Sequence, residues 1–122
     1  MVMDFTFDKL EVYQKARKLV KQVYLLIKNF PNEEKYALCD QIRRAVISVP
    51  SNIAEGCGRM SIKERIHFIE ISYGSLMELY CQIQLACDLE YISEEQFTKI
   101  SQEIEEVARM LSGFRKSMLS RI

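Results

Sequence analysis

The chain has 122 residues, which is long enough for one domain whose core needs neither disulfides nor metal ions. It contains 17 basic and 17 acidic residues, and a net charge of zero argues against a protein that coats nucleic acid with an overall basic surface. The charge is nevertheless uneven, because residues 1–65 hold 12 basic and 8 acidic side chains whereas residues 66–122 hold 5 and 9. This asymmetry is compatible with a basic face on a neutral protein.

The compartment can be judged from what the sequence lacks. No apolar run approaches the roughly 20 residues that span a bilayer, and "MVMDFTFDKL" does not have the charged and then apolar order of a signal peptide. The cysteines include no C-x-x-C pair and are Cys39, Cys57, Cys81 and Cys87. We therefore predict a cytoplasmic protein with reduced thiols, no membrane contact, no metal and no cofactor.

The first predicted helix covers about Asp8 to Asn29. Its apolar residues recur at steps of three and four, which places them on one helix face. They are Val12, Ala16, Leu19, Val23, Leu26 and Phe30. Pro31 ends this segment, because the residue before a proline avoids the helical conformation.

The second predicted helix starts near Glu33 and ends at Gly56-Cys57-Gly58, where glycine is a favoured C-terminal cap. Its apolar stripe consists of Cys39, Ile42, Val46, Val49 and Ile53. Pro50 lies inside this helix. Because proline removes a backbone donor and crowds the carbonyl four residues earlier, we expect a kink there.

The third and fourth predicted helices each begin with a capping box, Ser61 with Glu64 and Ser93 with Gln96. A break at Tyr91-Ile92 separates them. The apolar stripe of the third helix is Ile62, Ile66, Ile69, Tyr73, Leu76, Tyr80, Ile83 and Cys87. That of the fourth is Phe97, Ile100, Ile104, Val107, Leu111, Phe114 and Met118.

Four helices of comparable length with short connections predict an all-α, up-down-up-down four-helix bundle, with the second helix kinked near Pro50 and residues 1–122 forming a single domain. The third helix also carries a second apolar stripe, about 120° from the first. It consists of Phe68, Ile71, Leu79, Ala86 and Leu89. Either this helix is the most buried of the four, or the second stripe meets another subunit.

The sequence offers little for catalysis or metal binding. Glu64-Arg65-Ile66-His67 has the E-x-x-H spacing of di-iron bundles, but that chemistry needs a second such motif and His67 is the only histidine. A single histidine without a paired nucleophile does not support Ser-His or Cys-His catalysis. Glu55, Glu70 and Glu78 are candidate acids or bases, yet bundle helices carry many solvated glutamates. We predict a non-enzymatic protein with no catalytic residue.

Basic residues cluster on both sides of the segment 46–58. They are Arg43, Arg44, Arg59, Lys63 and Arg65, and they form our candidate surface for nucleic acid or another partner. The alternative is a solvated face with local ion pairs. The basic residues late in the fourth helix suit the helix dipole without any partner, and they are Arg109, Arg115, Lys116 and Arg121.

A polar stripe lies nearly opposite the apolar stripe of the second helix. It consists of Gln41, Arg44, Ser48, Ser51, Asn52 and Glu55. These side chains are mostly short and uncharged, which is compatible with a hydrogen-bonded seam at an interface or with a ligand surface. Together with Pro50 and Gly56 they form a candidate structural motif. We expect Asn52 and Glu55 to organise the bend or a subunit interface rather than to perform chemistry.

The segments "QIRRAVISVPSNIAEGCGR", "FIEISYGSLMELYCQI" and "LEYIS" resemble the four-helix-bundle family of proteins encoded in 23S ribosomal RNA intervening sequences. The resemblance extends over nearly the whole chain and is most specific in Ser51-Asn52-Ile53-Ala54-Glu55-Gly56. The sequence is also similar to the accessory variability determinant of diversity-generating retroelements.

The resemblance implies a bacterial protein that forms a ring-shaped homo-oligomer, a pentamer, and it implies no catalytic residues. The retroelement relative works with a reverse transcriptase and nucleic acid. Two hypotheses follow. The first is an oligomeric helical bundle that binds RNA, DNA or a nucleoprotein partner through a basic surface. The second is a protein-interaction scaffold that does not bind nucleic acid.

Overall fold

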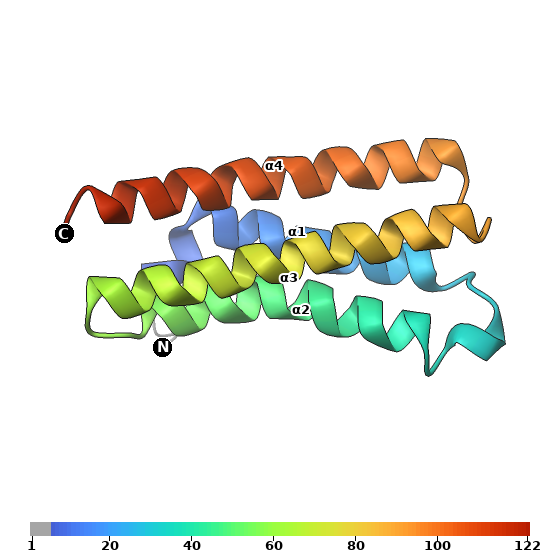
Figure 1. Cartoon of the computed structure of the whole chain (residues 1–122), viewed down its shortest axis with the longest axis horizontal. Helices are drawn as coiled ribbons and strands as arrows, with labels where there is room; N and C mark the ends of the chain where they lie inside the picture. Colours follow the sequence, from blue (N-terminus) through green and yellow to red (C-terminus); the bar gives the residue numbers. More distant parts are fainter. Residues whose placement is uncertain (1–5) are drawn as a thin grey trace.

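The computed structural model describes residues 6–122, which form four long α-helices and no β-strand in that range. The helices are α1 (Glu11–Ile27), α2 (Leu38–Cys57), α3 (Ile62–Asp88) and α4 (Glu94–Leu119), and two short 3-10 helices are η1 (Thr6–Lys9) and η2 (Asn32–Glu34). Consecutive helices run in opposite directions, and each packs against the preceding and the following one, with α4 closing against α1 (Figure 1). The predicted all-α four-helix bundle is confirmed.

The apolar stripes of the four helices meet in one core. The largest fully buried side chains come from every helix, and they include Leu19, Ile42, Ile53, Leu76, Ile83 and Leu111. Complete burial of one such side chain stabilises the fold by about 1.5–3 kcal/mol relative to its exposure. None of the helices in the described part of the chain combines the length and the apolar character that crossing a membrane requires.

Helix α2 begins later than predicted but ends within the predicted segment Gly56-Cys57-Gly58. It begins at Leu38 and not near Glu33, because the residues after Pro31 first form η2. It then continues through Pro50 and ends at Cys57 with Gly58 as the C-cap residue. A proline inside a helix costs one backbone hydrogen bond, and here the packing of α2 against its neighbours keeps the helix continuous.

Within this segment Gly58, and not Gly56, is the capping glycine. Gly56 lies inside the last turn, is buried and has no positive φ angle. Its lack of a side chain is needed for another reason: a Cβ atom at this position would lie 3.0 Å from the Phe68 Cβ and 3.2 Å from the Arg65 carbonyl oxygen. Gly56 therefore allows the backbones of α2 and α3 to approach closely.

The turn between α3 and α4 combines two capping motifs. The predicted capping box of α4 is complete, with the Ser93 hydroxyl and the Gln96 side chain each accepting a backbone N–H. At the end of α3, Glu90 adopts a positive φ of 64°, and the Tyr91 N–H donates to the Ala86 carbonyl over 2.9 Å. This is the Schellman arrangement, with glutamate at the position that usually carries glycine.

Two corrections concern α3. The Ser61 hydroxyl accepts the Glu64 N–H over 3.1 Å, but Glu64 does not complete the predicted box, since no hydrogen bond from the Ser61 N–H to its carboxylate is found. Of the five residues of the second apolar stripe, Leu79 and Ala86 are fully buried and Phe68 is half-buried within the chain. Ile71 and Leu89 remain 38% and 53% exposed, so at most this part of the stripe is available to another subunit.

Candidate functional site

The five basic residues predicted as one cluster lie in two places. Arg43 and Arg44 are near the start of α2, whereas Arg59 follows its end. At 1.5 Å per residue the length of α2 keeps these positions about 20 Å apart. The chain thus separates Arg43 and Arg44 from the group formed by Arg59, Lys63 and Arg65 at the turn between α2 and α3.

The group at the α2–α3 turn is held by specific contacts. The Arg65 Nε donates to the carbonyl of Arg59 over 2.8 Å, and the Arg59 guanidinium lies 4.6 Å from the centroid of the Phe68 ring. Arg59 also lies 3.6 Å from the Glu55 carboxylate. Lys63 is exposed and forms no ion pair with any residue that the structure describes. Two arginines are therefore positioned within the chain, and the lysine points to solvent.

Helix α4 brings further basic residues to this end of the bundle, as its C-terminal end lies beside the α2–α3 turn (Figure 1). Segments 58–65 and 109–122 together hold seven basic residues and one acidic residue. We call these two segments the basic end. The neighbouring residues 6–11 contribute Asp8, Lys9 and Glu11 and change this balance by one charge.

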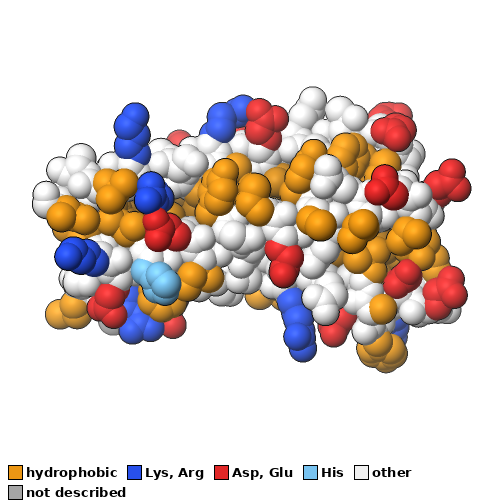
Figure 2. Space-filling view, in the orientation of Figure 1, with side chains coloured by type: hydrophobic (Ala, Val, Ile, Leu, Met, Phe, Trp, Pro, Cys, Tyr) orange, Lys and Arg blue, Asp and Glu red, His pale blue; other side chains and the backbone are white. Residues whose placement is uncertain are grey.

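The opposite end has the opposite charge. Segments 28–40 and 88–95, which we call the acidic end, hold two basic and seven acidic residues. Figure 2 shows this difference on one face, with acidic side chains gathered at one end of the bundle and basic side chains more frequent at the other. The contribution of Arg115, Lys116 and Arg121 was not predicted from the sequence, because these residues were assigned to the dipole of their own helix. The up-down topology, combined with the charge count at each helix end, could have placed them at the same end of the bundle as Arg59 and Lys63.

Arg43 and Arg44 are in different environments. The Arg43 Nη2 donates to the Lys35 carbonyl over 2.8 Å and lies 3.8 Å from the Asp40 carboxylate. This fixes its guanidinium against the connection between α1 and α2. Arg44 is exposed, and no ion pair involves it within residues 6–122.

A polar seam joins α2 to α3 beside Pro50. The hydroxyls of Ser48 and Ser75 are 2.7 Å apart, and the Asn52 Nδ2 donates to both the carbonyl and the hydroxyl oxygen of Ser48 over 2.8 Å. The fully buried Ser72 donates its hydroxyl to the Val49 carbonyl over 2.8 Å. We define the polar seam as these four side chains, Ser48, Asn52, Ser72 and Ser75. It contains no ionisable group.

The seam uses only part of the predicted polar stripe. Gln41, Ser51 and Glu55 are exposed, and the partners of Ser48 and Asn52 belong to the same chain. Ser72 and Ser75 were not among the predicted site residues. Their signal was the spacing of two small polar residues three apart in an otherwise apolar helix, "SYGS".

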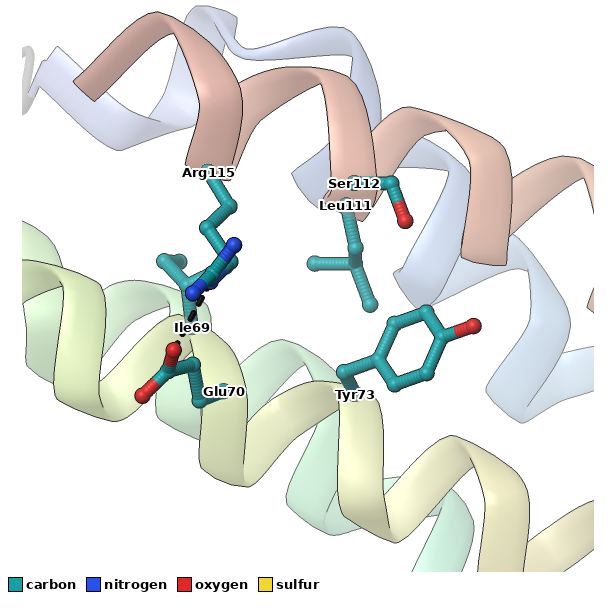
Figure 3. A pocket seen from close by; sticks show the side chains of 6 residues that line it. All are labelled: Ile69, Glu70, Tyr73, Leu111, Ser112 and Arg115. Atoms are coloured by element: carbon teal, nitrogen blue, oxygen red, sulfur yellow. Dashed lines mark hydrogen bonds and ion pairs between the residues drawn. The ribbon is translucent and has the colours of Figure 1, made fainter. Parts of the chain in front are cut away.

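The glutamates considered for acid–base chemistry have cations or solvent as neighbours. A pocket of about 270 Å³ lies between α3 and α4, where the Arg115 Nε donates to the Glu70 carboxylate over 2.7 Å at its rim and the Tyr73 ring forms a wall (Figure 3). Glu55 faces Arg59, and Glu78 is exposed. These contacts bring no two of the three carboxylates together as an acid and a base.

Among the described residues, the histidine and the cysteines do not assemble into a catalytic or metal-binding site. His67 is exposed, and its ring lies 5.6 Å from that of Phe68. The four cysteines are free thiols. Burial raises the pKa of the Cys57 thiol above its ordinary value, although Arg65 acts in the opposite direction. No group of three potential metal-ligating His, Cys, Asp or Glu side chains occurs within residues 6–122.

Comparison with known proteins agrees with the fold. The profile of the family described as "23S rRNA-intervening sequence protein" matches residues 8–113. A crystal structure of a protein with unknown function from the S23 ribosomal protein family of Bacteroides thetaiotaomicron VPI-5482 superimposes with a TM-score of 0.80 at 26% identity, covering 86% of this chain and 95% of that one. No functionally curated protein matches the sequence.

Proposed function

The chain belongs to the 23S rRNA-intervening sequence protein family. Because the protein in the similar crystal structure has an unknown function, we propose a role from the surface of this chain. We propose that it is a non-enzymatic, oligomeric helical bundle that binds nucleic acid or a nucleoprotein partner through the basic end. Arg59, Lys63 and Arg65 are the contact residues at the α2–α3 turn, and Arg115 and Lys116 extend the surface on α4.

The observation that supports this proposal is the unequal charge of the two ends of the bundle. Phosphate contacts need several cations on one surface, and the basic end supplies seven against one acidic residue in its two segments. Lys63 and Lys116 are exposed and have no ion pair in the described chain, so their charges are available to a partner. Net neutrality of the whole chain does not oppose this role, because the compensating acids lie at the other end.

Binding at two salt concentrations tests the proposal. Fluorescence anisotropy with a mixed pool of RNA and DNA should give an affinity that falls steeply with salt, since phosphate contacts release counterions. The double variant Lys63→Glu/Lys116→Glu should abolish most of this binding and reduce the salt slope by about one for each lost contact. Lys99→Glu is the matched control, because Lys99 is exposed and outside the basic end. Absence of binding by the unaltered protein at low salt would refute the proposal.

The alternative function is a protein-interaction scaffold without nucleic-acid binding, and a second observation favours it. Hydrophobic side chains form a band along α3 and its boundary with α4 (Figure 2). On α3, Ile71, Met77 and Leu85 are 38%, 39% and 47% exposed. Contiguous exposed apolar surface of this kind is typical of interfaces.

Light scattering tests the assembly. We expect a homo-oligomer, a pentamer as the family resemblance implies, and expect Ile71→Glu/Leu85→Glu to dissociate it. Leu119→Glu places the same charge at an apolar residue that is 41% exposed on α4 and should leave the mass unchanged. A monomer at micromolar concentration contradicts both functions. An oligomer that does not bind nucleic acid favours the scaffold.

A further inference from the structure

A second pocket lies at the other end of the bundle, between α1 and α2. It has a volume of about 400 Å³ and is formed by the last turns of α1, the connection that follows and the first turns of α2. Four of the side chains that line it are basic, Lys21, Lys28, Lys35 and Arg43, and none of the described residues lining it is acidic. By contrast, the smaller pocket between α3 and α4 pairs one arginine with Glu70.

The four cations gather in a part of the molecule that is otherwise acidic. Neither Glu34 nor Asp40 lines the pocket. The Glu34 carboxylate accepts the Tyr91 hydroxyl over 2.6 Å, whereas Asp40 lies 3.8 Å from Arg43 and compensates part of that one charge. Glu33 is exposed and does not line the pocket. Lys21 and Lys28 form no ion pair with any described residue. Positive charges that share one pocket repel one another, and an anion in the pocket removes that cost.

The interior of the pocket is apolar. Tyr24 and Leu25 are 37% and 55% exposed beside the lysines, and Phe30 and Pro31 close the wall. Lys21, Tyr24, Leu25 and Lys28 have the i, i+3, i+4, i+7 spacing of one helix face, so α1 presents an aromatic and an aliphatic side chain between two cations. This combination suits a ligand with a flat ring and a negatively charged group.

We propose that this pocket binds a nucleotide unit, with its phosphate at Lys21, Lys28 and Arg43 and its base against Tyr24 and Leu25. The volume lies within the range of small-molecule sites. Bases stack on tyrosine whatever their identity, and lysine and arginine are the usual phosphate partners. The Arg43 Nη2 donates to the Lys35 carbonyl and lies 3.8 Å from the Asp40 carboxylate, which leaves the other guanidinium N–H groups for the phosphate. The unit is either a free nucleotide or part of a single strand.

Isothermal titration calorimetry with ATP, AMP, adenosine and a 12-nucleotide single-stranded RNA tests the site and its source. We expect ATP to bind more tightly than AMP and adenosine to bind weakest. Lys21→Glu/Lys28→Glu should lower the affinity for ATP at least tenfold, because it inverts two charges of the pocket. Tyr24→Leu should weaken ATP severalfold but leave inorganic triphosphate unchanged, since it removes only the ring.

The matched control is Lys18→Glu/Lys99→Glu, which makes the same charge change at two exposed lysines outside the pocket and should alter binding by less than twofold. If the RNA binds more tightly than ATP and Lys21→Glu/Lys28→Glu abolishes this binding, the natural ligand is a nucleotide unit of a single strand. If the pocket binds ATP but not the RNA, the ligand is a free nucleotide. The pocket proposal is overturned if neither binds at millimolar concentration, or if the control weakens ATP equally. If ATP does not bind and RNA binding is removed only by Lys63→Glu/Lys116→Glu, the pocket proposal is also overturned, while the proposed function at the basic end stays intact.

Discussion

The two helix pairs that share α3 are packed in different ways. Against α2, the contact is close and uses small residues: Gly56 has no side chain between the helices, and the polar seam is made of serines and one asparagine. Against α4, the contact uses large side chains such as Tyr73 and Leu111 and contains a pocket of about 270 Å³ (Figure 3). One helix thus has a closely packed neighbour and a loosely packed neighbour. We expect substitutions that add atoms to be costly on the first side and tolerated on the second.

Gly56→Ala is expected to have the largest effect. The new Cβ would meet the Phe68 Cβ at 3.0 Å and the Arg65 carbonyl at 3.2 Å, neither of which is the free end of a flexible side chain. Overpacking of this kind costs about 1–3 kcal/mol, and the better helix propensity of alanine offsets up to about 1 kcal/mol. The free energy of unfolding should fall by about 1–2 kcal/mol, measured by urea denaturation at one protein concentration.

Gly74→Ala is the matched control for this prediction. Like Gly56, Gly74 lies inside a helix, here α3, but a Cβ there would have no neighbour within 4 Å. Only the propensity gain remains, so the free energy of unfolding should rise by up to about 1 kcal/mol. If both alanine variants are stabilised to the same extent, close packing of α2 against α3 does not depend on Gly56.

The close α2–α3 contact is also where sequence reasoning reached its limit. Periodicity located all four helices, because each apolar stripe follows the geometry of its own helix. The function of Gly56 depends on Phe68 and Arg65, which belong to another helix, so a glycine near a helix end was interpreted as a cap. Its partners become visible only when the crossing of α2 and α3 is known.

The candidate site was likewise predicted only in part. Arg59, Lys63 and Arg65 were predicted together, and they do lie at one turn, because few residues separate them. Arg43 was assigned to the same surface, but the length of α2 separates it from that turn. The α4 residues Arg115 and Lys116 were not assigned to it, although they lie at the same end of the bundle (Figure 1). Closeness in sequence therefore predicted the residues that share one turn. It did not predict the residues of α4, which the topology of the bundle brings to the same end.

The two turns of α3 also differ, and Glu90→Gly sharpens that difference. Glu90 ends α3 with a φ of 64°, a conformation that costs non-glycine residues about 1 kcal/mol, whereas Gly58 before α3 has an ordinary φ of −84°. Glycine at position 90 should raise the free energy of unfolding by up to about 1 kcal/mol. Glu90→Ala removes the same carboxylate without relieving the backbone. An equal gain in both variants would assign the effect to charge and not to conformation.

The smallest effect concerns pH and separates the polar seam from the α3–α4 turn. The Tyr91 hydroxyl donates to Glu34 over 2.6 Å, and this hydrogen bond raises the pKa of Tyr91 to about 12. The folded pKa exceeds the unfolded value of about 10, so the stabilisation is present below pH 10 and is lost as pH rises towards 12. In an ultraviolet titration, the Tyr91→Phe variant should lack the one tyrosine that ionises near pH 12 in the wild type.

The stability difference between wild type and Tyr91→Phe should shrink over the same interval. The difference for Ser72→Ala should stay constant, because the seam has no group that titrates. If the stability difference between wild type and Ser72→Ala changes with pH in parallel with that of Tyr91→Phe, the polar seam and the α3–α4 turn are not independent. In that case the closely packed side of α3 and its turn to α4 would unfold as one coupled unit, and the contrast between the two neighbours of α3 would be one of packing only.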